Sequence, residues 1–338
     1  MKEMSDRLWK TDGSMSRKIA ENIYQITIDL ENKALRSLNS YYIKGLPGEK
    51  SLLIDAGFKT ASCFDQIMSQ LRPLGYEKEN TDFLCTHMHT DHTALSTALA
   101  GENCQIFMHE ADLDFARFRS PGTKAFEDFM HQFIEEGVPI EKVTGFEVRK
   151  SIRNADFRDP RFVPFSGGKH LSYGGYDLEL IHVPGHSAGN CMIWVESLSL
   201  MLTGDHILYD ITPNISVLPG EKDLLGAYLN SLRLADRYDP EITCPAHRES
   251  GDYHKRIAEL LLHHDARIKE CLDIVRMHPG SNAYEIAGRL SWSVKARSFE
   301  EFPDEQIFFA LSETLAHLEY LRIRQKIRKE GSCRYYPG

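Results

Sequence analysis

Short apolar runs alternate with amphipathic segments along the first part of the chain. The runs near Ile23–Ile28, Tyr41–Lys44 and Leu52–Asp55 predict three strands. The segment Ala61–Leu71 has the apolar spacing of a helix, and Phe83–Thr86 predicts a further strand. Because strands and helices alternate, the pattern indicates an α/β protein.

Residues 111–160 depart from this alternation and predict an inserted helical segment. The segment contains phenylalanines spaced by threes, fours and an eight, which predicts one apolar helical stripe or two short ones. We favour a satellite core for this stripe over a lid on a substrate site, since apolar stripes usually pack. The residues are Phe115, Phe118, Phe126, Phe129 and Phe133.

A domain boundary is predicted near residues 277–283. A Pro-Gly pair there ends the preceding helix, and the Ser-Asn pair that follows can cap the next one. The chain therefore divides into a large domain over residues 18–276 and a small domain over residues 281–338. In the small domain we expect helices at Ala283–Leu290 and Glu305–Tyr320 and a hairpin at Gln325–Tyr336.

The composition is that of an acidic chain without export signals. The 338 residues carry a net charge of −9, which disfavours nonspecific binding to nucleic acid. The segment Met1–Arg17 lacks the apolar core of a signal peptide, and no run approaches the roughly 20 apolar residues that span a bilayer. The seven cysteines are scattered and form no Cys-x-x-Cys pair. We therefore expect a cytoplasmic enzyme that does not associate with membranes.

Three imidazoles and one carboxylate lie within six residues, from His87 to His92, directly after an apolar strand. Side chains two residues apart share a face, so His87 and His89 point the same way. Asp91 and His92 lie in the following turn and can face a second position beside the first. Imidazole nitrogen and carboxylate oxygen are typical ligands of zinc-like cations. A loop rich in histidine by chance is the alternative, and this spacing argues against it.

Three later apolar strands each lead into another ligand-type side chain. His186 follows a Pro-Gly turn, Asp205 ends a strand after a glycine, and His247 lies just past a third strand. In α/β proteins, sites usually form where strands give way to loops at one edge of the sheet. We therefore expect these three side chains to join the first four.

Taken with the segment Leu52–Gly57, the order of these motifs resembles the metallo-β-lactamase superfamily of hydrolases over about residues 20–250. The resemblance implies a four-layer αββα sandwich, and the small domain resembles the winged-helix-like domain of one subgroup. It also implies two divalent cations. In the family pattern, His87, His89 and His186 hold the first cation, Asp91, His92 and His247 hold the second, Asp205 bridges both, and Asp55 orients the ligands without binding metal.

The expected chemistry is hydrolysis by a metal-bridging hydroxide. Two cations lower the pKa of a bridging water, and the hydroxide attacks a carbonyl or phosphoryl centre. Asp205, as the bridge, and Asp91, which orients the nucleophile and carries a proton to the leaving group, are the expected catalytic carboxylates. We expect zinc, and iron or manganese also suits such a ligand set.

Three more residues are candidates for substrate contact. Tyr209 and Asn214 lie in the loop after Asp205 and can polarise a substrate oxygen, or they can simply form a capped turn before the next helix. Arg248 stands directly after His247, where relatives often have glycine. It can contact an anionic group of the substrate or pair with a nearby acid.

The main functional hypothesis is hydrolysis of a small-molecule thioester, ester or lactone, similar to the glyoxalase II branch. The glutathione-binding segment of that branch is not recognisable in this chain. The alternative is a phosphodiesterase or endoribonuclease of the same fold. A persulfide dioxygenase with a single iron is disfavoured because the second set of ligands is complete.

A basic cluster in the small domain could bind nucleic acid, which remains an alternative partner. However, residues 281–338 carry 9 basic and 8 acidic side chains, so we favour a packing or lid role for this domain. A homodimer would be an ordinary oligomeric state. The cluster consists of Arg322, Arg324, Lys326, Arg328 and Lys329.

Overall fold

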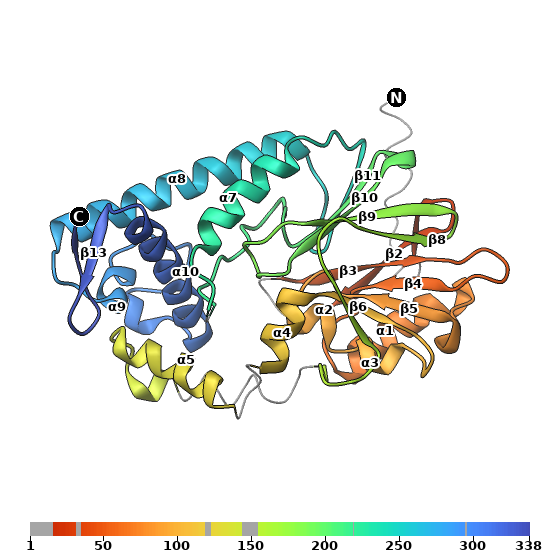
Figure 1. The fold of residues 1–338 in the computed structure, drawn as a ribbon, viewed down its shortest axis with the longest axis horizontal. Coiled ribbons are helices and arrows are strands. Elements are labelled where there is room, and N and C mark those ends of the chain that lie inside the picture. Colours follow the sequence, from red (N-terminus) through yellow and green to blue (C-terminus); the bar gives the residue numbers. More distant parts are fainter. Residues whose placement is uncertain (1–15, 32–34, 119–122, 144–154, 219, 295) are drawn as a thin grey trace.

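Two stacked β-sheets form the centre of the larger part of the molecule (Figure 1). The structure is a computed structural model and describes residues 16–31, 35–118, 123–143, 155–218, 220–294 and 296–338. The first sheet has seven strands in chain order: β1 (Arg17–Ala20), β2 (Ile23–Asp29), β3 (Ser37–Ile43), β4 (Ser51–Ile54), β5 (Thr81–Leu84), β6 (Ile106–His109) and β7 (Phe162–Phe165). The second has five strands in the order β12 (Ile242–Pro245), β11 (Leu200–Gly204), β10 (Cys191–Val195), β9 (Tyr176–His182) and β8 (Lys169–Tyr173).

Helices cover the outer face of each sheet, which gives four layers (Figure 1). Successive side chains of a strand point to opposite faces, so Leu84 packs between the two sheets while Phe83 packs toward the helices outside the first sheet. Met201 likewise packs outward from the second sheet. This arrangement confirms the predicted αββα sandwich. The first sheet is covered by α1 (Ala61–Leu71), α2 (Thr90–Thr93), α3 (Ser96–Leu99) and α4 (Glu110–Phe118), and the second by α7 (Leu224–Ala235) and α8 (Tyr253–Met277).

The carboxyl ends of several parallel strands meet at one edge of the sandwich. Strands β4 to β7 are parallel to one another, as are β11 and β12. The predicted strands lie within a few residues of the observed ones. The strand predicted at Phe83–Thr86 ends at Leu84, because the N–H of Thr86 donates to the carboxylate of Asp55 at 2.9 Å. The chain therefore leaves the sheet where the ligand-type residues begin.

The carboxyl-terminal part forms a second, mainly helical core. It contains α5 (Lys124–Glu135), α9 (Ala283–Ala287), α10 (Asp304–Ile323) and a hairpin of β13 (Ile327–Glu330) and β14 (Arg334–Pro337). Asn282 caps α9 as one of the two predicted candidates: its side chain accepts from the N–H of Glu285 at 2.8 Å. The two helices and the hairpin of the small domain thus lie where the sequence predicts them.

The helix α8 contributes to both cores, so the two parts share one continuous element (Figure 1). Ile257 and Leu260 pack on the second sheet, while Cys271 and Val275 pack in the carboxyl-terminal core. The buried positions of α8 recur every three or four residues on one face, so a single apolar stripe contacts both cores. The division at residue 276 remains a prediction.

The segment predicted as one helical insertion is split between two cores. α4 packs on the first sheet through Leu113 and Ala116, whereas α5 belongs to the carboxyl-terminal core. Phe126, Phe129 and Phe133 pack in that core, as the satellite-core interpretation predicts. Two parts of the predicted insertion lie outside the described residues, namely 119–122 and 144–154. The same is true of residues 1–15, which belong to the segment where no signal peptide is expected.

No helix among the described residues is both long enough and apolar enough to cross a bilayer.

Candidate metal centre

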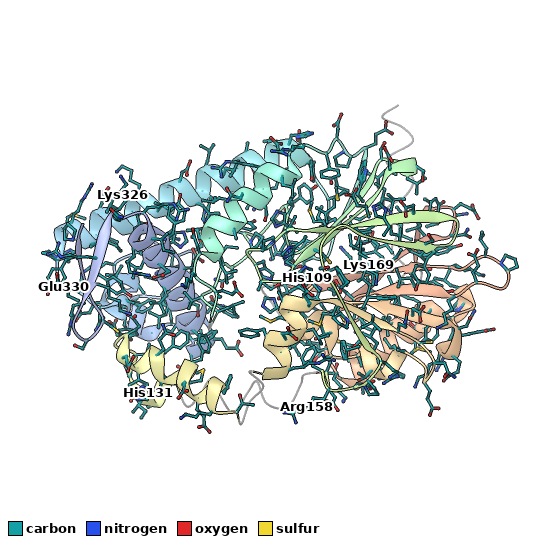
Figure 2. The ribbon with its side chains drawn as sticks, in the orientation of Figure 1. His109, His131, Arg158, Lys169, Lys326 and Glu330 are labelled. Atoms are coloured by element: carbon teal, nitrogen blue, oxygen red, sulfur yellow. The ribbon has the colours of Figure 1, made fainter. Side chains whose placement is uncertain are left out.

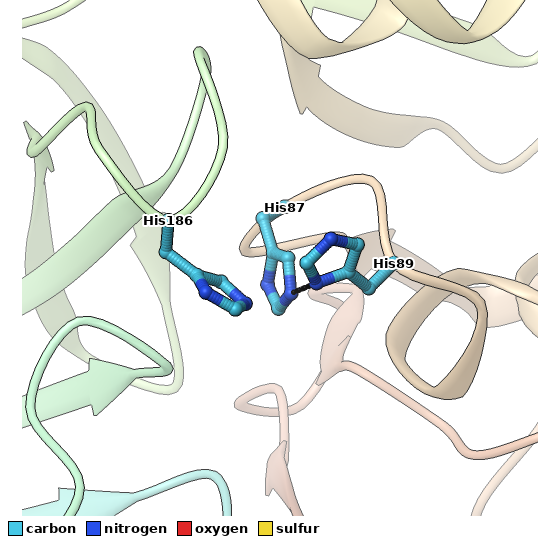
Figure 3. Close-up of side chains that lie close together, drawn as sticks. All are labelled: His87, His89 and His186. Carbon is cyan, nitrogen blue, oxygen red and sulfur yellow. Dashed lines mark hydrogen bonds between the residues drawn. The ribbon is translucent and has the colours of Figure 1, made fainter. Parts of the chain in front are cut away.

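Three imidazoles converge at the carboxyl ends of β5 and β9 (Figure 3). His87 and His89 come from the loop that follows β5, and His186 comes from the loop that follows β9. Nε2 of His87 lies 2.9 Å from Nδ1 of His89, and the ring of His186 lies 4.9 and 4.5 Å from theirs, centroid to centroid. Two ring nitrogens this close require a proton or a cation between their lone pairs.

A second group lies beside the first. Asp91 and His92 belong to the short helix α2, and His247 follows β12. Oδ2 of Asp91 lies 3.4 Å from Nε2 of His247 and 3.7 Å from Nε2 of His92. The three side chains are buried, so their polar atoms face one another and not water.

Asp205 lies between the two groups. Its Oδ2 is 3.5 Å from Nε2 of His186 in the first group. Its Oδ1 is 3.6 Å from Nε2 of His92 and 3.5 Å from Nε2 of His247 in the second group. The two oxygens of one carboxylate thus face different groups of nitrogen donors.

The donor atoms of these groups suit a divalent cation. Nε2 of His92, His186 and His247 and Oδ1 of Asp205 are buried and make no hydrogen bond within the described part of the chain. Buried polar atoms are normally paired, so these unpaired atoms, which share one space, fit a bound cation. All seven expected ligand side chains lie in this space. Their role as metal ligands remains a prediction.

In three of these imidazoles Nδ1 makes a hydrogen bond on the side of the ring away from the common space, and this bond orients the ring. Nδ1 of His92 bonds Asp55 at 2.7 Å, Nδ1 of His186 bonds the carbonyl of Asn214 at 2.8 Å, and Nδ1 of His247 bonds the carbonyl of Ser37 at 2.6 Å. Such contacts set the tautomer and the ring direction of a metal ligand. In each case Nε2 is left to face the common space.

Asp55 supports both groups. Its Oδ2 contacts His92 directly and accepts from the hydroxyl of Thr86 at 2.8 Å; that hydroxyl lies 3.1 Å from Nδ1 of His87. Asp55 has a φ of +55°, a left-handed conformation that aspartate tolerates better than most residues. Both side-chain contacts of Oδ2 are hydrogen bonds, and the role of Asp55 in orienting the ligands without binding metal remains a prediction.

The protonation of the site follows from its burial and its charges. Burial lowers the pKa of His89 to about 3, and the imidazole of His186 adds to the effect. For His92, burial opposes the charge, but three neighbouring carboxylates outweigh it and raise the pKa to about 9. Burial also opposes ionisation of Asp91, yet the imidazoles of His92 and His247 lower its pKa to about 2. A cation in the second group would therefore displace protons as it binds.

The sequence analysis did not identify Asp112 of α4. Its buried carboxylate accepts from the N–H of Met88 at 2.9 Å, from the hydroxyl of Ser187 at 2.6 Å and from the N–H of Gly189 at 2.6 Å. It thereby ties the loop of His87 and His89 to the loop of His186. No local pattern marks this residue, because its partners lie 24, 75 and 77 positions away.

The candidate substrate residues do not join the ligand groups. The ring of Tyr209 packs against Gly251, and its hydroxyl makes no hydrogen bond within the described residues. Asn214 uses its carbonyl to hold His186 and its side chain to contact α10. Contact with the substrate remains a prediction for both side chains.

Arg248 has a φ of +60°, a left-handed conformation that glycine adopts without strain. Its carbonyl accepts from the side chain of Asn39 at 2.8 Å. It also lines a cavity of about 350 Å³ together with Arg17 and Thr243, and none of the seven ligand side chains lines that cavity. Contact with the substrate remains a prediction for this residue.

The chain is similar in sequence to known proteins. The sequence profile of the Metallo-beta-lactamase superfamily matches residues 35–247. The chain is 26% identical over 316 residues to the "Probable metallo-hydrolase YqjP" of Bacillus subtilis (strain 168), and the match covers 88% of this chain and 92% of that protein.

Two solved structures are similar over almost the whole chain. A metallo-beta-lactamase family protein from Thermus thermophilus has a TM-score of 0.77 at 24% identity, covering 95% of this chain and 100% of its own. A beta-lactamase domain protein from Burkholderia ambifaria has a TM-score of 0.78 at 21% identity, covering 98% and 96%. At these identities the likeness establishes the fold, including the carboxyl-terminal helical part.

Proposed function

The chain belongs to the metallo-β-lactamase superfamily and is a metal-dependent hydrolase, and from this premise we propose that it is a binuclear enzyme that cleaves a small-molecule thioester, ester or lactone. The observation that carries the binuclear part of the proposal is the position of Asp205. One of its oxygens lies near His186 and the other near His92 and His247. A carboxylate that faces two groups of donors is suited to bridge two cations.

We propose zinc as the metal. Each group supplies at least two imidazole nitrogens, and ligand sets rich in histidine are typical of zinc. Iron and manganese accept similar donors, and their supply in the cell influences which metal is bound. Metal analysis of the purified protein decides between the three.

The proposed hydrolysis uses a zinc-bound water and the carboxylate of Asp91. Bound zinc ions lower the pKa of water toward neutrality and so supply the attacking hydroxide. Asp91 is ionised at neutral pH, because its neighbours His92 and His247 outweigh the effect of burial on its pKa. Its carboxylate can orient the nucleophile by accepting a hydrogen bond. The oxygen of water adds to the acyl carbon, the C–S or C–O bond breaks, and the water proton passes to the leaving thiol or alcohol.

The charges of the carboxyl-terminal part support a small-molecule substrate over a nucleic acid. Figure 2 shows Lys326 and Glu330 on the hairpin at the end of the molecule that is remote from the sheets. Four of the five side chains of the basic cluster are neutralised by acids of the same chain, which reduces the charge available for phosphates. The pairs are Arg322–Glu319, Arg324–Asp223, Arg328–Glu330 and Lys329–Glu136, at 2.6 to 2.9 Å.

The proposal is tested by turnover with the zinc-loaded full chain. A panel of acyl thioesters, an aryl ester and a lactone is assayed beside a generic phosphodiester. Asp91→Ala is the inactive variant, and Asp210→Ala, an exposed acid in the loop after Asp205, is the matched control. We expect thioester or ester cleavage that is lost in Asp91→Ala, retained in Asp210→Ala, abolished by a chelator and restored by zinc.

Two other outcomes would change the proposal. Phosphodiester cleavage with no acyl cleavage would make the enzyme a phosphodiesterase and RNA the next substrate to try. One metal ion per chain at saturation, with full activity, would contradict the binuclear centre.

A further inference from the structure

The loop after β11 brings the carboxyl-terminal helices into contact with the metal centre. The carbonyl of Asn214 in this loop accepts from Nδ1 of His186 at 2.8 Å. That bond sets the direction in which Nε2 of His186 faces Asp205. Whatever holds the peptide of Asn214 in place therefore also holds this imidazole.

The side chain of Asn214 is held by α10. Its Nδ2 lies 3.3 Å from Oε2 of Glu313 and 3.4 Å from the carbonyl of Phe309, and its Oδ1 accepts from the hydroxyl of Ser216 at 2.5 Å. Residues 309 and 313 are four positions apart and thus lie on one face of the helix. This face of α10 is the one turned toward the ligand loop.

Glu313 is itself fixed by α8. Its Oε1 lies 3.6 Å from Nε of Arg267, and the two side chains are only 15% and 11% exposed. Arg267 in turn donates to the carbonyl of Ser291 at 2.6 Å and to Glu270 at 3.0 Å, and its guanidinium lies over the ring of Trp292. One oxygen of Glu313 thus lies near Arg267, whose own contacts hold it in place, and the other lies near Asn214.

We propose that Glu313 is a positioning residue of the metal centre, which acts through Asn214 to hold the imidazole of His186. This inference rests on the proposed metal-dependent function. It assigns a role to the carboxyl-terminal part of the chain, because α10 supplies a side chain that controls a ligand without touching the metal or the substrate.

The affinity for zinc itself tests this role without any substrate. Metal-free full-length protein is titrated with zinc in competition with a chromophoric chelator, for Glu313→Ala, Asn214→Ala and the double variant. Each single variant should bind the more weakly held zinc about 10-fold less tightly, as loss of a partner behind a ligand usually does. Since Glu313 acts through Asn214, the double variant should be no weaker than either single variant.

Two further variants separate positioning from a general effect on folding. Glu313→Gln keeps an oxygen for Asn214 and should restore most of the affinity. Glu319→Ala removes another acid of α10, which pairs only with the nearby Arg322 among the described residues, and should leave the affinity unchanged. The visible spectrum of cobalt-substituted protein should change in Glu313→Ala and not in Glu319→Ala.

Unchanged zinc affinity in Glu313→Ala, or additive losses in the double variant, would overturn the inference. If Glu313→Ala does not fold, Asn214→Ala tests the inference by itself. Glu313 remains in place in that variant, and an unaltered zinc affinity would contradict a role of Glu313 that acts through Asn214. A wild-type chain that binds no zinc would overturn the proposed function as well. Zinc binding and hydrolysis by the wild type with unaffected variants would overturn only the role of Glu313.

Discussion

The carboxylate of Asp112 accepts a hydrogen bond from the hydroxyl of Ser187 at 2.6 Å, and this contact joins two loops that are far apart in the sequence. The same carboxylate accepts from the N–H of Met88 and from the N–H of Gly189. Met88 and Ser187 are each next to a ligand-type histidine. One buried side chain therefore sets the separation of the loops that carry the first donor group.

Replacing Asp112 by asparagine should weaken both folding and zinc binding. The amide nitrogen would face an N–H or O–H donor, and a buried donor that loses its partner costs about 1–3 kcal/mol of the free energy of unfolding. Urea unfolding and a zinc titration measure the two effects. Asp114→Asn changes an exposed acid of the same helix and should alter neither quantity. Equal losses in the two variants would contradict the role of Asp112.

Gly189 is required by the close approach of its backbone to α4. A Cβ at this position would lie 2.8 Å from both the Cβ and the backbone nitrogen of Asp112, which is too close for any real contact. We expect Gly189→Ala to lower the free energy of unfolding by about 1–3 kcal/mol, the usual range for overpacking. Gly288→Ala is the control, because its new Cβ would meet neighbours only at 3.5 Å or more. Thermal unfolding of both variants measures the difference.

Removing the carboxylate of Asp205 should lower the metal content of the protein. Its oxygens face both donor groups, so Asp205→Ala leaves the nitrogens of the two groups without their shared anionic partner. Elemental analysis after zinc loading should give fewer ions per chain than in the wild type, together with loss of hydrolysis. Full zinc occupancy and full activity in this variant would sink the assignment of Asp205 as the bridge.

Two buried histidines between α8 and α10 should make folding sensitive to acid. Burial, reinforced by His317, lowers the pKa of His264 to about 2, and burial lowers that of His317 to about 4. In the unfolded chain a histidine binds a proton near pH 6.5, so below that pH the unfolded state holds more protons. Stability is thus fully present above pH 6.5 and is lost as the pH falls toward the folded values. At pH 5 each histidine accounts for about 2 kcal/mol.

Urea unfolding at pH 7.5 and pH 5.0 measures this loss, with a chelator present so that metal binding does not contribute. His264→Phe keeps an aromatic ring at the site and should lose about 2 kcal/mol less than the wild type between the two pH values. His278→Phe, which changes an exposed histidine at the end of the same helix, should behave like the wild type. The same loss in His264→Phe as in the wild type would show that this site does not carry the acid sensitivity.

Much of the site could be predicted because several of its side chains lie close together in short segments of the chain. His87, His89, Asp91 and His92 are close in the chain, so the geometry of one strand and one turn brings them together. The same holds for the strands and helices themselves, whose apolar spacing is a local property. The sequence left open whether the phenylalanines of residues 111–160 form one apolar stripe or two short ones, and the tertiary packing decided it, since α4 and α5 pack in different cores.

The sequence by itself determined the α/β class and the order of the ligand-type side chains, because periodicity and spacing depend only on neighbouring residues, while the four-layer sandwich was implied by the family resemblance. Only the tertiary structure decided which residues contact the ligand-type side chains and their loops. Asp112 meets donors 24 to 77 positions away, and Glu313 meets Asn214 across 99 positions. It also turned Asn214 toward α10 and Tyr209 toward Gly251. Such contacts depend on how distant elements pack, and no local pattern of residues encodes that.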